Sequence, residues 1–142
     1  MRYKLINHTA DIGIRLGSKT LKGLFEDAAF ALFDILCDIK KVRASFKRTI
    51  SVESGNREEL LNEFLNTLLK EFTLENNLVG KVKIKSIDSN NALRLVLSAV
   101  IQGEPYDPKR HTIKTEIKAV TFHNLSIKKT SGGYTAEVVF DV

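Results

Sequence analysis

The chain has 142 residues with a formal net charge of +5, and 43% of the residues are hydrophobic. This length and composition are those of one ordinary globular domain, residues 1–142, with enough apolar side chains for a sizeable core. The single cysteine, Cys37, excludes an intrachain disulfide and fits a reducing compartment. Because its neighbours are apolar, we expect Cys37 to be a buried small hydrophobe rather than a nucleophile. No apolar stretch approaches the ~20 residues of a membrane span and no secretory h-region begins the chain, so we expect a cytoplasmic protein without membrane contact.

The basic residues allow a polyanionic partner without demanding one. They are dispersed over three regions, which contain Lys40, Lys41, Arg43, Lys47 and Arg48; Lys81, Lys83 and Lys85; and Lys128 and Lys129. The second group is spaced by two, which on a strand would place its members on one solvent face. This pattern favours a solvated or lysine-protected strand edge over contact with RNA, and it leaves RNA contact open.

Two short strands and a helix are predicted in the first part of the chain. Arg2 to Ile6 and Ile12 to Gly17 show the alternation of strands, and Asp11 falls on the face of the second strand that is opposite its apolar side chains. Thr20 is a suitable N-cap for a helix that runs from Leu21 to about Asp38, where apolar residues recur at helical spacing.

A third strand and a second helix follow. Phe46 to Val52 has the strand pattern, and Asn56 with Glu59 has the spacing of a helix N-cap and its capping partner. The apolar stripe of the helix consists of Leu61, Phe64, Leu65, Leu68 and Phe72. The side chains expected on its solvent face are Glu58, Glu63, Lys70 and Glu71. The helical pattern fades at Asn76.

From Lys81 onward the hydrophobic pattern changes to a period of two. Strands are predicted at Lys81 to Ile87, Leu93 to Ile101, Glu116 to Lys128 and Tyr134 to Val142, with a loop at Gly103 to His111 and a hairpin turn at Ser131 to Gly133. Strands at both ends with two helices between them predict an α+β fold, in which antiparallel β-sheets pack with two α-helices in a single compact domain.

Two carboxylates near opposite ends of the chain fall on the polar faces of their strands. Asp11 stands at the start of one strand, and Asp141 alternates with the apolar face of the closing strand. With the terminal carboxylate of Val142 they would make an all-oxygen site that suits a hard cation. Strand-end turn formers or caps remain the simpler interpretation of the two Asp residues. His8 is open as a ligand, a base or a loop histidine.

A second set of polar residues lies further along the chain. Glu104, Asp107 and His111 fall on the predicted loop, and Lys118 and His123 on the strand after it. On a regular strand Lys118 and His123 would face opposite sides, which argues against a Lys-His catalytic pair. Lys118 fits a surface lysine or a contact to a partner equally well. Phosphate-loop, Rossmann, nucleophile-elbow and zinc-ligand spacings are all absent from the sequence, so no recognisable active site is assembled.

Several blocks along the whole chain resemble, in order, the archease family. These blocks are His8 to Ile14, Ala28-Ala29 with Leu32 to Asp34, Leu60 to Asn66, Gly103 to Pro108, Lys118 to His123 and Val139 to Val142. The chain departs from the family pattern at Asn62-Glu63-Phe64, where the family commonly carries Asp-Trp, and at Gly23, where an acidic or bulky residue is usual. Neither departure falls on the proposed site.

The resemblance implies a small protein cofactor rather than an enzyme. Members of the family assist the GTP-dependent RNA ligase that joins tRNA exon halves, promoting guanylylation of the ligase histidine and multiple turnover. A chaperone-like role has also been associated with the family. Carried over residue by residue, the family metal site falls on Asp11, Asp141 and Val142, the last through main-chain oxygen, and calcium is the implied ion. Lys118 matches a lysine that the family uses, and we expect it to contact the ligase.

Two alternatives to the ligase activator remain at this point. One is a basic RNA-binding module that brings tRNA halves to the ligase, which the net charge motivates. The other is a metal-dependent hydrolase that uses His8 and the two Asp residues, for which the sequence shows few convergent groups.

Overall fold

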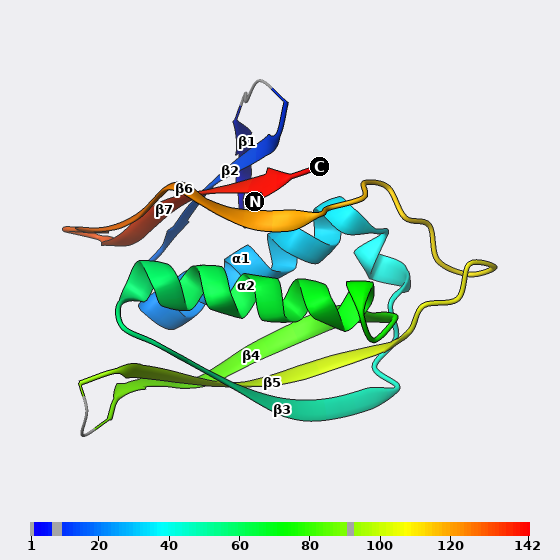
Figure 1. Ribbon diagram of the computed structural model, residues 1–142, viewed down its shortest axis with the longest axis horizontal. Helices are drawn as coiled ribbons and strands as arrows, with labels where there is room; N and C mark the ends of the chain where they lie inside the picture. The colour runs from blue at the N-terminus through cyan, green and yellow to red at the C-terminus, as the bar shows by residue number, and fades with distance from the viewer. Residues whose placement is uncertain (1, 7–9, 91–92) are drawn as a thin grey trace.

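Two helices lie between two antiparallel sheets in the computed structural model of the chain (Figure 1). The structure describes residues 2–6, 10–90 and 93–142, and the backbone alone of Asn124. The first sheet has the order β1-β2-β7-β6, with bounds Lys4–Ile6, Ile12–Ser18, Gly133–Asp141 and Ala119–Thr130. The second has the order β3-β5-β4, with bounds Phe46–Ser54, Leu95–Pro105 and Asn77–Ser89. The helices are α1, Leu21–Leu36, and α2, Arg57–Thr73, and a short 3-10 turn, η1, spans Ile39–Lys41. The predicted α+β class is confirmed.

Both helices begin at the predicted caps. The Thr20 hydroxyl accepts a hydrogen bond from the Gly23 N–H at 3.0 Å, and the Asn56 side chain accepts one from the Glu59 N–H at 2.9 Å. Each bond satisfies one of the amides that a helix N-terminus leaves without an internal partner. The predicted starts of α1 and α2 are therefore confirmed.

Helix α1 ends slightly earlier than predicted, at Leu36, because Cys37 takes an extended backbone and forms a bridge with Ile113. The Cys37 side chain is buried as predicted, and its thiol lies 3.2 Å from the Phe33 carbonyl oxygen. Burial raises the pKa of the Cys37 thiol to about 12, so the thiol stays protonated at neutral pH.

The core fills the space between the two sheets. Apolar faces of α1 and α2 meet there, and the rings of Phe25 and Phe64 lie 5.8 Å apart across the two helices. The largest fully buried side chains include Phe25, Phe33, Phe64, Phe140, Ile14, Leu16, Leu24 and Leu65. Both sheets thus share one core, which fixes the end of each strand relative to the helices.

Several sequence-based expectations about these elements are wrong. Glu71 is buried and pairs with Arg48, whereas a solvent-facing position was expected. Leu93 was expected to begin a strand, but it is 84% exposed with a φ of 62° and lies in a turn before β5. β5 extends through Pro105 into the predicted loop, and β6 begins at Ala119 rather than at Glu116.

Within the described part of the chain, no helix has both the length and the apolar character needed to cross a membrane.

Side-chain amides of α2 hold the beginning of the edge strand β6. The Asn66 side chain accepts a hydrogen bond from the Val120 N–H at 3.0 Å and donates one to the Val120 carbonyl at 3.0 Å. Asn62 donates to the same carbonyl at 3.0 Å. Because β6 is the last strand of its sheet, these bonds occupy peptide groups that a further strand would otherwise take.

Replacing Asn66 with alanine is expected to lower the free energy of unfolding by about 1–3 kcal/mol, because the buried Val120 N–H loses its acceptor. The measurement is urea unfolding followed by circular dichroism. Glu63→Ala, an exposed change on the same helix, is the control and is expected to stay within about 0.5 kcal/mol of the parent. Equal effects of the two substitutions would contradict the assigned role of Asn66.

Candidate functional site at one end of the four-stranded sheet

The register of β2 and β7 brings the two ends of the chain together. Ile12 pairs with Phe140 and Gly13 with Val139 in this antiparallel pair. Continuing the same register by one residue places Asp11 opposite Asp141. Directly opposite residues in an antiparallel pair share one face, and Phe140 beside them points into the core. Asp11 and Asp141 therefore share the face of the sheet that is turned away from the helices, as their parity predicts.

Lys118 and the C-terminus lie at the same place. The Lys118 N–H donates a hydrogen bond to the Asp141 carbonyl at 2.8 Å, and Ala119 pairs with Asp141 as β6 begins. Asp11, Asp141 and Val142 are half-buried, and Lys118 is exposed. The structure thus places the four predicted site residues around the end of β7, although they come from both ends and the middle of the sequence. His8 lies outside the described residues.

The chemistry of this donor set fits a hard divalent cation. Two carboxylates and the Val142 main-chain oxygen supply oxygen ligands only, which is the preference of calcium. Calcium takes about 6–8 oxygen ligands, so the remaining positions would be left for water or for a partner. Among residues 2–6, 10–90 and 93–142, no group of three or more His, Cys, Asp or Glu side chains is placed to hold a metal ion. The main-chain oxygen of Val142 belongs to none of these side-chain classes.

An open hollow of about 490 Å³ adjoins Asp11, and sequence reasoning did not predict it. Asp34 of α1 and Lys114 of the segment before β6 line it together with Asp11. The Asp34 carboxylate accepts a hydrogen bond from the Tyr3 hydroxyl at 2.7 Å. Burial, reinforced by the Asp34 carboxylate, raises the pKa of Tyr3, so this hydroxyl is held as a donor. The available signal in the sequence was a lone acid at position 34 inside an apolar helical run.

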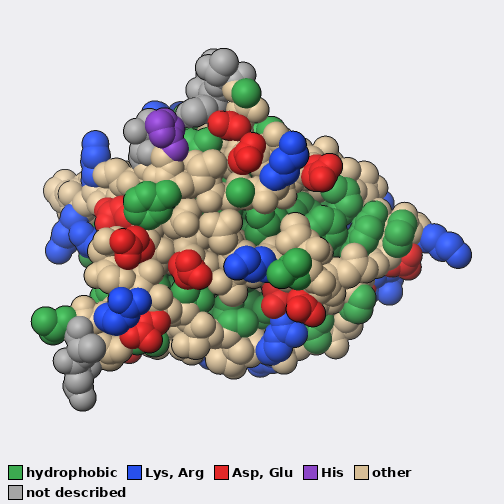
Figure 2. Space-filling model, viewed as in Figure 1, with side chains coloured by type: hydrophobic (Ala, Val, Ile, Leu, Met, Phe, Trp, Pro, Cys, Tyr) green, Lys and Arg blue, Asp and Glu red, His purple; other side chains and the backbone are tan. Residues whose placement is uncertain are grey.

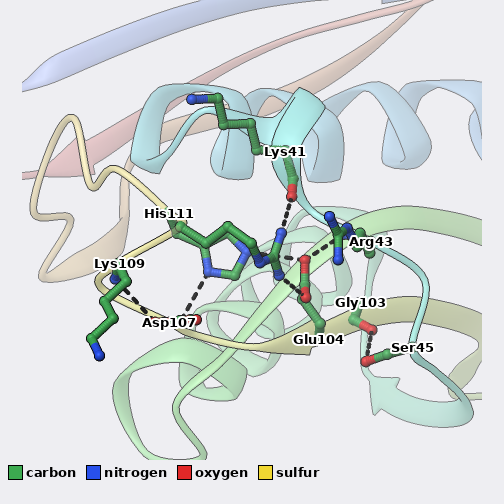
Figure 3. Close-up of polar contacts among 9 residues, drawn as sticks. Lys41, Arg43, Ser45, Gly103, Glu104, Asp107, Lys109 and His111 are labelled. Carbon is green, nitrogen blue, oxygen red and sulfur yellow. Dashed lines mark hydrogen bonds and ion pairs between the residues drawn. The ribbon is translucent and has the colours of Figure 1, made fainter.

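A second polar cluster is built around a buried carboxylate (Figure 3). Glu104, at the end of β5, is 6% exposed, and His111, on the loop that follows, is 5% exposed. The Glu104 carboxylate pairs with the Arg110 guanidinium, accepts a hydrogen bond from the Arg43 main-chain N–H at 2.6 Å and lies 3.0 Å from Nε2 of His111. The Asp107 N–H donates to Nδ1 of His111 at 2.9 Å. In the neutral imidazole Nε2 therefore carries the proton and donates to Glu104.

These contacts keep Glu104 ionised. Burial by itself would raise the pKa of its carboxyl group. The hydrogen bonds from the Arg43 main chain and the His111 ring, together with the Arg110 charge, outweigh burial and lower the pKa below its ordinary value. The sequence placed Glu104, Asp107 and His111 on one loop, whereas the structure assigns Glu104 to a strand and joins it to a turn more than fifty residues earlier in the chain.

We expected Lys118 and His123 to face opposite sides because we assumed that both lie on one regular strand. That assumption is wrong. Lys118 precedes β6, and the pairing of β6 with β7 shifts between Thr121 and Ser126. Within this irregular segment Phe122 is 51% exposed, although its alternation with Val120 would have turned both side chains the same way. A strand periodicity cannot assign faces across such a shift.

The face of the molecule in Figure 2 carries acidic and basic side chains side by side, with apolar side chains scattered between them. Such mixing is ordinary for a surface and marks no binding region by itself.

Comparisons with known proteins extend over the whole chain. The profile of the archease protein family matches residues 3–142. Protein archease of Methanosarcina mazei is 35% identical over 141 residues, covering 99% of this chain and 96% of that protein. Protein archease of Methanopyrus kandleri is 34% identical over 142 residues and covers all of both chains. The solution structure of Methanobacterium thermoautotrophicum protein 1598 has a TM-score of 0.82 at 31% identity, with 99% of each chain covered.

The profile spans both halves of the candidate site, because Asp11 and Asp141 fall within the matched residues. The likeness of fold is equally complete, from β1 to the end of β7. Sequence, fold and full-length relatives agree, and the chain belongs to the archease family.

Proposed function

We propose that this protein activates the GTP-dependent RNA ligase of tRNA splicing, promoting guanylylation of the ligase and repeated turnover in exon joining. Membership of the archease family supports a role related to tRNA splicing and the part of a protein cofactor rather than an enzyme. The observation that carries the proposal is the meeting of Asp11, Asp141 and Val142 with Lys118 at one exposed sheet end.

Asp11, Asp141 and the Val142 main chain would hold a divalent ion, and calcium suits this oxygen donor set. When bound, the ion would supply positive charge that screens the phosphates of a nucleotide. The chain itself would position that charge. The β2–β7 ladder holds the two carboxylates on one face of the sheet. Both side chains are partly exposed there, so a partner could reach them.

Lys118 would contact the ligase beside this site. Its side chain is exposed, and its main-chain N–H is fixed on the Asp141 carbonyl at 2.8 Å. A partner that docks on the carboxylate site would therefore meet the exposed Lys118 side chain beside it. Such a charge at the rim of an interface chiefly steers association and fixes orientation.

Asp141→Ala is expected to abolish stimulation of the ligase, because it removes one of two carboxylates from the site. The measurement is multiple-turnover RNA ligation by the cognate ligase at limiting enzyme, with GTP and a divalent metal ion, at a series of activator concentrations. Glu137→Ala is the matched control, since Glu137 lies on the same strand and face but pairs with Arg15 instead. Circular dichroism verifies that both variants are folded.

Calcium titration by calorimetry separates the possible outcomes. Loss of both calcium binding and stimulation in a folded Asp141→Ala variant supports the proposal. Loss of calcium binding with full stimulation would make the ion a structural tie between the chain ends and would contradict the proposed role. If the parent protein fails to stimulate the ligase, the activator function itself is wrong.

A further inference from the structure

Five basic side chains surround one open hollow of about 450 Å³ at the turn after α1. Lys40, Lys41 and Arg43 come from η1 and the segment that follows it, and Lys109 and Arg110 come from the loop after β5. In Figure 1 the two segments, cyan and yellow, lie side by side at the right of the molecule. Hydrogen bonds join them, from the Arg110 guanidinium to the Lys41 carbonyl at 3.2 Å and from the Asp38 N–H to the Thr112 carbonyl at 3.3 Å.

The hollow is organised by the buried carboxylate of Glu104. One carboxylate oxygen pairs with Arg110, and the other accepts the Arg43 main-chain N–H at 2.6 Å (Figure 3). The bonds from Glu104 therefore reach both segments that carry the basic residues. Arg110 is thereby held in place, with its side chain 31% exposed, while Lys40, Lys41, Arg43 and Lys109 are exposed. A shape that is set in advance reduces the entropic cost of binding a ligand there.

The charge of the hollow is positive. Glu104 is the acid in contact with Arg110, and its single charge is already shared with the His111 and Arg43 donors. The nearby Asp107 side chain accepts the Lys109 main-chain N–H at 3.0 Å and lies outside the lining of the hollow. Each of the five residues that line the hollow is a lysine or an arginine.

We infer that this basic hollow, formed by Lys40, Lys41, Arg43, Lys109 and Arg110, is a binding surface for the phosphate backbone of RNA. A nucleic-acid strand carries one negative charge per nucleotide, and lysine and arginine are the side chains that neutralise it. An acidic protein surface is the competing partner. The centre of a protein interface is apolar or aromatic and poor in charge, whereas none of the described residues that line this hollow is apolar. The composition of the hollow therefore favours RNA.

One segment of the chain connects the hollow with the carboxylate site. Residues 109–118 run from Lys109 and Arg110 in the hollow to Lys118 at the Asp141 carbonyl. An RNA strand held in the hollow would thus lie on a segment that also reaches the carboxylate site. The inference does not rest on ligase activation, because RNA binding in the hollow requires no ligase.

The test is a fluorescence anisotropy titration of a labelled single-stranded RNA with the full chain at several salt concentrations. In the first variant Lys40, Lys41 and Lys109 are all replaced by glutamine, which leaves the Glu104 contacts intact. In the control variant Lys83, Lys128 and Lys129, which are exposed elsewhere, are replaced by glutamine. Both variants lose the same net charge. Removal of three phosphate contacts is expected to reduce the log–log salt slope by about 2, at roughly 0.7 per contact on a single strand.

RNA affinity is expected to fall at least about tenfold in the first variant relative to the control variant at moderate salt. Equal losses in the two variants would overturn the inference, because binding would then follow net charge alone. Absence of RNA binding by the parent protein would overturn it as well. If the first variant instead loses binding to an acidic polyglutamate peptide while its RNA affinity is unchanged, the partner is a protein and the inference is wrong. Asp141→Ala is expected to bind RNA as the parent does, so a failure of the ligase proposal is distinguishable from a failure here.

Discussion

Replacing Glu104 with alanine is expected to lower the free energy of unfolding by about 3–5 kcal/mol, the cost of breaking a buried ion pair from one side. The substitution leaves the Arg43 main-chain N–H and Nε2 of His111 without their acceptor. His111 is nearly inaccessible to water, so its donor cannot find a replacement there. Arg110 is partly exposed and can turn towards solvent, which limits its share of the loss.

Urea unfolding at neutral pH, followed by the helical circular dichroism signal, measures this loss. Glu53→Ala is the control, because Glu53 also pairs with an arginine, Arg94, but both of those side chains are about half exposed. An exposed pair contributes about 0–1 kcal/mol, so the control is expected to be nearly neutral. A Glu104→Ala variant as stable as Glu53→Ala would show that the Glu104 cluster does not stabilise the fold.

The pH dependence of the same difference has a defined sign. The pKa of Glu104 is lowered in the folded protein, so the unfolded chain binds a proton at this group more readily than the folded protein does. The stabilisation is therefore complete above the ordinary glutamate pKa of about 4.3 and is lost as the pH falls through the lower, folded-state pKa. The difference in stability between the parent and Glu104→Ala is expected to shrink on acidification below about pH 4 and to stay constant above about pH 5.5.

The local elements of this fold could be predicted because each leaves a signal within a few residues. Thr20 and Asn56 cap their helices as expected, because a cap acts on an amide three residues away. The parity of β7 agrees with the burial of Val138 and Phe140 and with the exposure of Glu137, but Val139, on the same face as the half-buried Asp141, is buried against the prediction. From that parity alone the sequence already placed Asp11 and Asp141 on matching polar faces.

The contacts that join distant segments could not be predicted. Glu71 looked like a solvent-facing residue of α2, but β3 supplies Arg48 as its partner, so burial of its charge becomes tolerable. The basic hollow likewise combines Lys40 and Lys41 with Lys109, residues that are almost seventy positions apart. In the sequence Lys40 and Lys41 belonged to one of the dispersed basic groups and Lys109 to none of them, and separation along the chain says little about separation in space.

The candidate site shows the same limit. The sequence allowed β2 to pair with β7 but did not single out this pairing among the possible strand orders. The presence of Asp34 and Lys114 in the hollow beside Asp11 depends on how α1 packs, which no local pattern predicts. Because the pairing of β6 is irregular, Phe122 does not face the side that strand alternation predicts. Periodicity describes one element at a time, and a binding site is formed by several.

Replacing Gly103 with alanine is expected to cost about 3 kcal/mol, at the upper end of the usual cost of overpacking. A Cβ atom at Gly103 would lie 2.0 Å from the Leu78 carbonyl oxygen and 3.0 Å from the Val79 Cα. Both contacts are to backbone, so no side chain can rotate away. Relief requires β4 to move relative to β5 at the register shift beside Val79, where the two strands already pair irregularly.

Gly132→Ala is the control for the general effect of replacing glycine. No atom lies within 4 Å of a Cβ built at Gly132, which lies in the exposed turn between β6 and β7. That variant is expected to be neutral or more stable by up to about 1 kcal/mol, because alanine reduces the freedom of the unfolded chain. Thermal and urea unfolding of the two variants measure the contrast. Equal stabilities would mean that β4 yields easily at the Leu78 carbonyl. The close approach of β5 to β4 at Gly103 would then not fix the position of β4.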